Sequence, residues 1–253
     1  MSTVLYEKRD HIAYVTLNRP DALNAMNREM NRELEHIWYD FDADQDLWIA
    51  ILSAAGDRAF SSGADLRAMA TGQGDDDPRP VHSLGHGIDV YKPIICGIHG
   101  YCLAAGLDLA LACDIRVAAE DASLGMTMTR WGVMASTGAS QLPRTIGWTK
   151  SMEMLLTAER ITAEEAYRIG LVNKVVPRDQ LISACEAYAQ TIMKNSPVAV
   201  RLTKEAALRG IDTTKAESLK IGFKLQDLNR TSEDAKEGPK AFSEKRQPEW
   251  KGR

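Results

Sequence analysis

The chain has 253 residues, enough for one large domain, and its 44% hydrophobic and 26% charged residues exclude a disordered or fibrous protein. Its 31 Lys and Arg residues are outnumbered by 35 Asp and Glu residues, and the resulting net charge of −4 argues against a nucleic-acid-binding groove. Four cysteines are too few for a disulfide scaffold. Cys96, Cys102 and Cys113 lie in the apolar stretch 93–113, so we interpret these three as buried thiols in a reducing cytoplasm.

The first half of the chain predicts alternating strands and helices. Residues 11–17 are rich in β-branched and aromatic side chains and predict a strand, which ends in a turn at residues 18–21. Apolar residues then recur at the spacing of an amphipathic helix: Met26, Met30, Leu34, Ile37 and Phe41. A short buried strand is predicted at residues 48–52. The strand–helix–strand pattern returns at residues 93–98, 105–113 and 115–119.

The most apolar stretch, residues 93–113, does not have the pattern of a membrane span. His99, Asp108 and several glycines interrupt it, so we expect a buried strand, a turn and a helix instead. The N-terminus shows no apolar signal segment. Residues 71–80 are polar and rich in Gly, Asp and Pro, which predicts a flexible loop.

From about Trp148 the pattern is mainly helical. Thr162 and Glu165 match a capping box, and Gly170 is placed to end that helix. Residues 171–176 predict a late strand, and Ser196-Pro197 opens another helix. The charged tail from residue 231 onward is expected to dock on the body or on another subunit.

The common catalytic motifs are missing from the sequence. There is no phosphate-binding loop, no dinucleotide-binding glycine pattern, no G-x-S-x-G and no C-x-x-C. His82 and His86 are four residues apart, but no third ligand is spaced to complete a metal site with them. We therefore expect no metal and interpret both histidines as solvent-facing residues beside the loop.

Two glycine-containing segments are the best candidates for a chemical site. Phe60–Leu66 follows a buried strand, whereas Gly100–Asp108 follows a strand and opens a helix. Small residues at 104–106 allow a ligand close to the backbone, and a helix N-terminus offers unpaired N–H groups to a carbonyl oxygen that becomes negative. Tight packing of strand against helix is the alternative interpretation of the same pattern.

Short motifs run through the chain in a fixed order: 17–20 with 22–25, 60–65, 92–95 with 100–101, 108–114, 162–176 and 233–246. Each is weak alone, but the ordered set resembles the crotonase superfamily, also called the enoyl-CoA hydratase/isomerase family. The resemblance covers essentially the whole chain. It implies an α/β fold, with a crotonase-like spiral of ββα units in residues 1–195 and a helical trimerisation region in residues 196–253.

The resemblance also implies the ligand and the residues that bind it. The substrate is an acyl-CoA thioester with no further cofactor, and the enzyme is a cytoplasmic homotrimer or dimer of trimers of fatty acid metabolism. Two backbone N–H groups hold the thioester oxygen in this family, and Ala64 and Ala105 match them. The CoA moiety is held by residues matching Arg19, Ala22, Leu23, Ala25, Ser62, Asp65, Leu66 and Arg67. Phe242 and Lys245 match tail residues that complete a neighbouring subunit's CoA site.

The sequence departs from the family at the acid–base residues. Hydratases of this family use two glutamates; the first position is Asp108 here, a carboxylate shorter by one methylene, and the second is Met128, which cannot transfer a proton. Around these positions we expect the acyl pocket to include His86, Met128, Trp131 and Ser136. Ser136 and Thr137 lack a base to activate them, and we interpret them mainly as caps of the helix that follows.

Three functions remain open at this point. The first hypothesis is a hydratase or dehydratase of an enoyl-CoA, a lyase in which Asp108 is the single acid–base carboxylate. The second is a decarboxylase or double-bond isomerase that uses the same oxyanion hole, since Met126-Thr127 resembles a Met-Thr pair of methylmalonyl-CoA decarboxylase. The third is an acyl-CoA-binding protein that has lost turnover through Met128.

Overall fold

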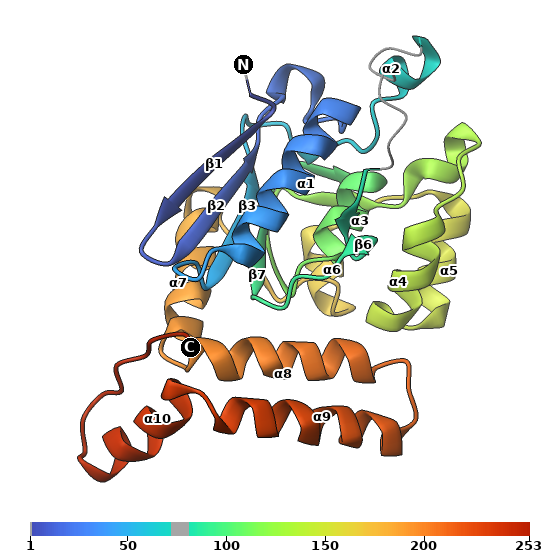
Figure 1. Cartoon of the computed structure of the whole chain (residues 1–253). Helices are drawn as coiled ribbons and strands as arrows, with labels where there is room; N and C mark the ends of the chain where they lie inside the picture. The colour runs from blue at the N-terminus through green and yellow to red at the C-terminus, as the bar shows by residue number, and fades with distance from the viewer. Residues whose placement is uncertain (1, 72–80) are drawn as a thin grey trace.

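The computed structural model describes residues 2–71 and 81–253, and a six-stranded sheet lies at its centre (Figure 1). Its strands lie in the spatial order β1 (Val4–Arg9), β2 (Ile12–Leu17), β3 (Ile49–Ala54), β7 (Ile94–Ile98), β9 (Ile115–Ala119) and β12 (Lys174–Val176). β1 and β2 are antiparallel, whereas the later pairings are parallel. β7 is buried along its whole length, as expected for a parallel strand covered on both faces.

A second sheet has four short strands, in the order β11 (Ile161–Thr162), β10 (Ser123–Gly125), β8 (Tyr101–Leu103) and β4 (Ala59–Ser61). Along the chain, a strand of the large sheet is followed by a strand of the small sheet and then by a helix. The helices of these three units are α2 (Leu66–Thr71), α3 (Ala105–Leu111) and α4 (Ser136–Ile146). The repeat confirms the predicted α/β class built from ββα units.

Helices cover both faces of the large sheet. α1 (Arg28–Ala43) packs on one face, and its buried residues confirm the predicted stripe from Met30 onward: Met30, Leu34, Ile37, Trp38 and Phe41. α7 (Leu181–Met193) packs on the opposite face through Leu181, Ala184, Cys185 and Ala189. The small sheet and α3 share the core with α1, so the start of α3 is supported from several sides.

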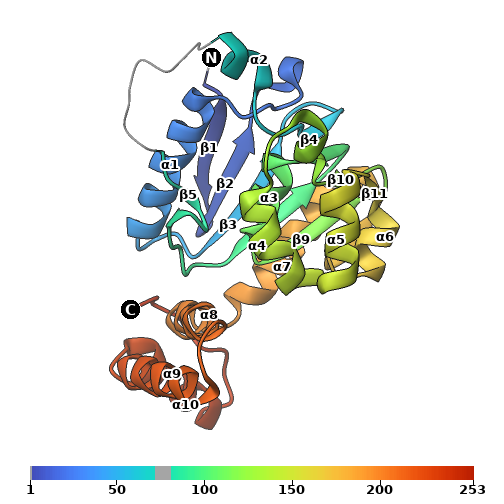
Figure 2. The same ribbon diagram turned by 90° about the vertical axis from the view of Figure 1, so that its right-hand side faces the viewer.

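The C-terminal helices form a separate layer below the sheets (Figure 2). α8 (Pro197–Gly210), α9 (Lys215–Arg230) and α10 (Glu233–Ser243) follow one another in this layer, and α8 and α9 share a small apolar cluster around Leu225. The buried carboxylate of Asp234 accepts hydrogen bonds from Ser196 Oγ and from the backbone N–H groups of residues 251 and 252. The charged tail therefore docks on its own chain, one of the two predicted partners.

The remaining elements connect these layers: η1 (Pro20–Ala22), β5 (Ser83–Leu84), β6 (Gly87–Ile88), η2 (Thr127–Trp131), α5 (Trp148–Thr157), α6 (Ala163–Arg168) and η3 (Arg178–Gln180). Thr162 Oγ1 accepts a hydrogen bond from Glu165 N at the start of α6, and Gly170 follows this helix with φ 78°. The Thr162 cap and the Gly170 stop are confirmed, whereas the Glu165 carboxylate, which would complete the capping box, accepts hydrogen bonds from Arg168 instead. None of the helices in residues 2–71 and 81–253 has the length and hydropathy needed to cross a bilayer.

Several sequence predictions differ from the structure. β1 was not predicted, because its outer residues are mostly exposed and charged. The late strand covers only residues 174–176, since Leu171 and Val172 are buried without joining the sheet. The helical half begins at Ser136 rather than Trp148. The N-cap of α4 is Ala135, and no side chain donates or accepts a capping hydrogen bond there, so the prediction that Ser136 and Thr137 cap this helix is wrong. Of the predicted loop, residues 72–80 lie outside the described residues.

Candidate active site

The start of α3 packs against the end of β4 at unusually short range. A Cβ placed on Gly106 would lie 2.7 Å from Ser61 Cβ, so only glycine allows this contact. Gly63, whose φ is 102°, approaches the same helix start: a Cβ there would lie 2.8 Å from Ala104 Cβ and 3.4 Å from Ala105 N. The two glycine-containing segments singled out in the sequence therefore meet at one point.

Two backbone N–H groups at this meeting point have no acceptor in the part of the chain that the structure describes. Ala105 is the first residue of α3, where a helix leaves its N–H groups without intrahelical partners. Ala64 forms a bridge with Met26, but the bonds of that bridge use Gly63 O and Asp65 N and leave Ala64 N unused. Within the described residues neither Ala64 N nor Ala105 N donates a hydrogen bond. Such a pair can stabilise an oxygen that gains negative charge.

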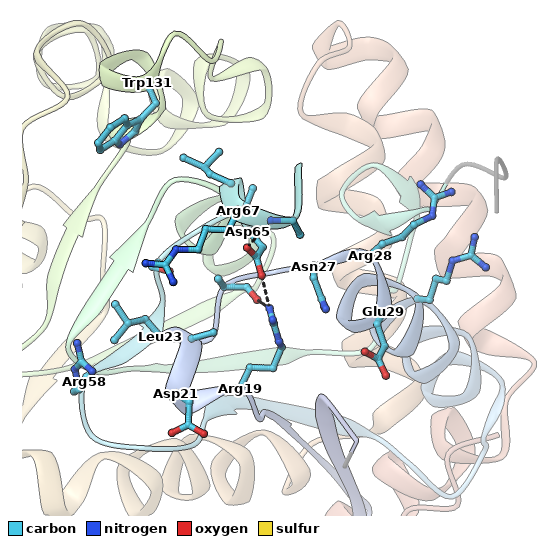
Figure 3. Close-up of a pocket in the computed structure, with 17 residues that line it drawn as sticks. Arg19, Asp21, Leu23, Asn27, Arg28, Glu29, Arg58, Asp65, Arg67 and Trp131 are labelled. Carbon is cyan, nitrogen blue, oxygen red and sulfur yellow. Dashed lines mark hydrogen bonds and ion pairs between the residues drawn. The ribbon is translucent and has the colours of Figure 1, made fainter. Parts of the chain in front are cut away.

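A large pocket of about 1030 Å³ opens on one side of this pair (Figure 3). All eight residues predicted to hold CoA line it: Arg19, Ala22, Leu23, Ala25, Ser62, Asp65, Leu66 and Arg67. Ala64 lines it too, as do Arg28, Arg32 and Arg58, which the sequence analysis did not identify. Arg28 and Arg32 are four residues apart on α1 and therefore share one helix face. This spacing could have identified them in the sequence as a pair of basic residues on one surface.

The loop that lines the large pocket is fixed by an ion pair. Arg19 Nη1 lies 3.0 Å from Asp65 Oδ2 and also donates to Ala25 O, as the dashed lines in Figure 3 show. Burial acts to raise the pKa of Asp65, but the hydrogen bond from Ala68 N and the Arg19 pair hold that pKa below its usual range. Asp65 is therefore an ionised anchor of the loop.

A smaller pocket of about 210 Å³ contains Asp108 and Ala105. Its other lining residues are Met26, Asn31, Val81, His82, Ser83, Leu84, Leu109 and Thr137. Burial raises the pKa of Asp108 to about 6. Asp108 Oδ1 is buried and has no hydrogen-bond partner among the described residues. A carboxyl group that lines a pocket and has a pKa near neutrality can exchange protons with a ligand there.

The four residues expected around the acyl group do not line the smaller pocket. His86 lies on an exposed turn, where its N–H donates to Ser83 O. Met128 packs against the hydrophobic core, Trp131 lines the large pocket, and Ser136 is replaced in the lining by its neighbour Thr137. The histidine that lines the pocket is His82 and not the predicted His86, which comes four residues later in the sequence.

Phe242 and Lys245 lie far from both pockets of their own chain. Phe242 is on α10 and is 86% exposed, and Lys245 follows the end of that helix. Figure 1 shows α10 at the bottom of the molecule and α2, whose first residues line the large pocket, at the top. In residues 2–71 and 81–253, no group of three or more His, Cys, Asp or Glu side chains is arranged to hold a metal ion.

Comparison with known proteins assigns the family. The model of the enoyl-CoA hydratase/isomerase family matches residues 7–253. The chain is 38% identical to an (E)-benzylidenesuccinyl-CoA hydratase from Thauera aromatica, over 98% of this chain and 99% of that protein. It is 34% identical to a short-chain-enoyl-CoA hydratase from Clostridium acetobutylicum, over 98% of this chain and 97% of that protein.

The solved structures agree with this assignment. A crystal structure of an enoyl-CoA hydratase from Mycobacterium tuberculosis H37Rv superposes with a TM-score of 0.94, at 36% identity and over 100% of both chains. An enoyl-CoA hydratase from Bacillus anthracis gives a TM-score of 0.92 at 34% identity, over 99% of this chain and 100% of that one. The chain belongs to the enoyl-CoA hydratase/isomerase family of the crotonase superfamily, and it is an enzyme of that family.

Proposed function

We propose that this enzyme adds water to the double bond of an enoyl-CoA thioester and removes it in the reverse direction. The observation that carries the proposal is the pair of unused N–H groups at Ala64 and Ala105 beside a carboxyl group, Asp108, whose pKa is about 6. Hydratase names among relatives that cover nearly the whole chain support the same reaction.

The thioester oxygen lies between the two N–H groups in the proposed complex. Attack of water on Cβ moves the double-bond electrons onto that oxygen, and each oxyanion donor is worth on the order of 3 kcal/mol in the transition state. Asp108 takes a proton from the water as the C–O bond forms. Its ionised form predominates above pH about 6, so it is available as a base at neutral pH.

Each of the two pockets binds one part of the substrate in this proposal. CoA occupies the pocket of about 1030 Å³, where arginines can pair with its phosphates. The acyl group occupies the pocket of about 210 Å³, whose apolar residues Met26, Leu84 and Leu109 cover a short chain. No metal or redox cofactor is required for this chemistry, because every step is a proton transfer or an addition.

The proposed assembly is a trimer or a pair of trimers. Large apolar side chains are exposed on α9 and α10, namely Leu219, Phe223, Leu228 and Phe242, and such patches mark contacts between chains. Phe242 and Lys245 then complete the CoA site of a neighbouring subunit. Light scattering is expected to give about three or six times the chain mass of 27.9 kDa. The mass of one chain would contradict the assembly.

The reaction is tested by mass spectrometry of a CoA-thioester panel in deuterated water. The panel contains straight, cyclic and aromatic enoyl-CoAs and a branched malonyl-CoA. We expect at least one enoyl-CoA to gain the mass of one heavy water molecule. Loss of carbon dioxide, or deuterium exchange without addition, would replace hydration by decarboxylation or isomerisation. Binding without any change in mass would indicate a protein that only binds acyl-CoA.

A further inference from the structure

The smaller pocket contains a histidine that the proposed mechanism does not use. His82 lines this pocket together with Asp108, although the two residues come from distant parts of the chain. The side chain of His82 is 44% exposed, so a small molecule in the pocket can reach its ring. Residue 128, where hydratases of this family carry their second glutamate, is a methionine, and its side chain packs against the hydrophobic core.

Glu35 on α1 fixes the position of His82. Its Oε1 atom lies 2.9 Å from the backbone N of His82 and 2.9 Å from the ring Nδ1. The backbone hydrogen bond and the ring of His82 hold the pKa of Glu35 below its usual range, in spite of the opposing effect of burial. Glu35 therefore remains a carboxylate that accepts the Nδ1–H of the ring.

This contact decides which ring nitrogen can react. A histidine that donates its Nδ1–H to a carboxylate gains or loses its second proton at Nε2. On the other edge of the ring, Gly87 leaves room for Cδ2, because a Cβ on Gly87 would lie 2.4 Å from that atom. Nε2 has no hydrogen-bond partner among the described residues. A base oriented by a carboxylate is a recurring arrangement for proton transfer.

We propose that His82, oriented by Glu35, is the second proton-transfer group of the active site and works opposite Asp108 in the smaller pocket. The proposal rests on the hydratase function above and divides its two proton transfers between two residues. Asp108 and His82 both line one pocket of about 210 Å³, and His82 Nε2 has no hydrogen-bond partner among the described residues; this is the observation that carries the proposal.

In hydration, one proton moves to Asp108 and one leaves His82. Asp108 carboxylate takes one proton of water while the water oxygen bonds to Cβ, and the double-bond electrons move to Cα and the thioester oxygen. The imidazolium form of His82 gives its Nε2 proton to Cα, which restores the thioester carbonyl. Asp108 is then protonated and His82 neutral, and solvent water returns the proton from one to the other after the product leaves. Dehydration is the reverse.

The test is chemical rescue of His82→Ala. The substitution is expected to lower kcat by about 10²-fold to 10³-fold, the range typical of a lost proton-transfer group, with little change in CoA affinity. Added imidazole should enter the space vacated by the ring and restore a rate that saturates with its concentration. His86→Ala is the matched control: it removes an exposed histidine four residues away and should change kcat less than twofold.

Several results would overturn the proposed role of His82. Activity of His82→Ala within threefold of wild type overturns the role of His82 and leaves hydration intact, as does a loss of kcat that imidazole does not restore while CoA still binds. Failure of the wild type to hydrate any enoyl-CoA overturns both proposals. If His82→Ala does not fold, as judged by circular dichroism, His82→Gln replaces it. A glutamine amide can still donate to Glu35 but transfers no proton, so an unchanged kcat in that variant also overturns the proposal.

Discussion

Asp108→Asn is expected to lower kcat by about 10³-fold or more while CoA binds with unchanged affinity. Asparagine has nearly the same shape but cannot take a proton from water, and a general base contributes about 10²-fold to 10⁴-fold. Asp108 lines the smaller pocket and not the large pocket proposed for CoA, so the CoA contacts should be kept. Steady-state kinetics with the enoyl-CoA found by the panel, and calorimetric titration with CoA, measure the two effects separately.

The same substitution is expected to make the fold more stable. Because burial raises the pKa of Asp108 from its usual value to about 6, the favourable contribution of the protonated form is present at low pH and is lost as the pH rises through 6. Asparagine stays neutral. The free energy of unfolding in urea at pH 8 should therefore rise by about 1–2 kcal/mol, and the difference should vanish near pH 4. Retained activity together with unchanged stability would remove Asp108 from the proposed mechanism.

Much of the fold could be predicted because periodicity and capping are local signals. The stripe on α1, the Thr162 cap of α6 and the Ser196-Pro197 start of α8 each depend on residues within a few positions of one another. β1 and the short strands β4, β8 and β10 were not predicted as strands. Three residues carry too little periodicity, and these strands are defined by partners distant in sequence, such as Leu124 opposite Cys102.

The candidate site likewise has a part that local sequence signals predict and a part that depends on residues distant in sequence. The segments around Ala64 and Ala105 could be recognised, since glycine and alanine beside a helix start indicate either close packing or the approach of a ligand. The lining of the smaller pocket could not be predicted residue by residue. The contact of His82 with Glu35 joins α1 to a segment 47 positions later, and two histidines four residues apart give no indication which one faces inward.

Gly138 lets α4 pack closely against Asp108 and Met126. A Cβ on Gly138 would lie 2.8 Å from Met126 Sδ and 3.3 Å from Asp108 Oδ1, so α4 approaches α3 closely at this point. The buried methionine fills the space behind the carboxylate, and Oδ1 is left buried and unpartnered among the described residues. The raised pKa of Asp108 therefore has its physical cause in this apolar wall, which takes the carboxylate away from water.

Ala105→Pro is expected to lower kcat/KM by at least about 10²-fold to 10³-fold, because it deletes one of the two proposed oxyanion donors without removing a side chain that contacts the substrate. Proline has no N–H, and its Cδ occupies the place where the thioester oxygen would be held. The first position of a helix is the one that tolerates proline, and Ala105 has that position in α3. Ala104, which precedes it, has φ 51° and ψ −123° and not the extended backbone that usually precedes proline, so circular dichroism and the urea midpoint must first establish that the variant folds.

The matched control is Lys215→Pro, which places proline at the equivalent first position of α9, after the Thr214 cap and far from both pockets. We expect this control to keep its activity within twofold. If Ala105→Pro folds and also keeps its activity, Ala105 N–H does not hold the developing charge. The carbonyl must then be bound elsewhere, and the buried carboxyl group of Asp108 would need another substrate position to act on. If activity falls only in Ala105→Pro and both variants fold, the thioester oxygen is bound at the N–H of Ala105, a contact that a substitution changing only a side chain would not test.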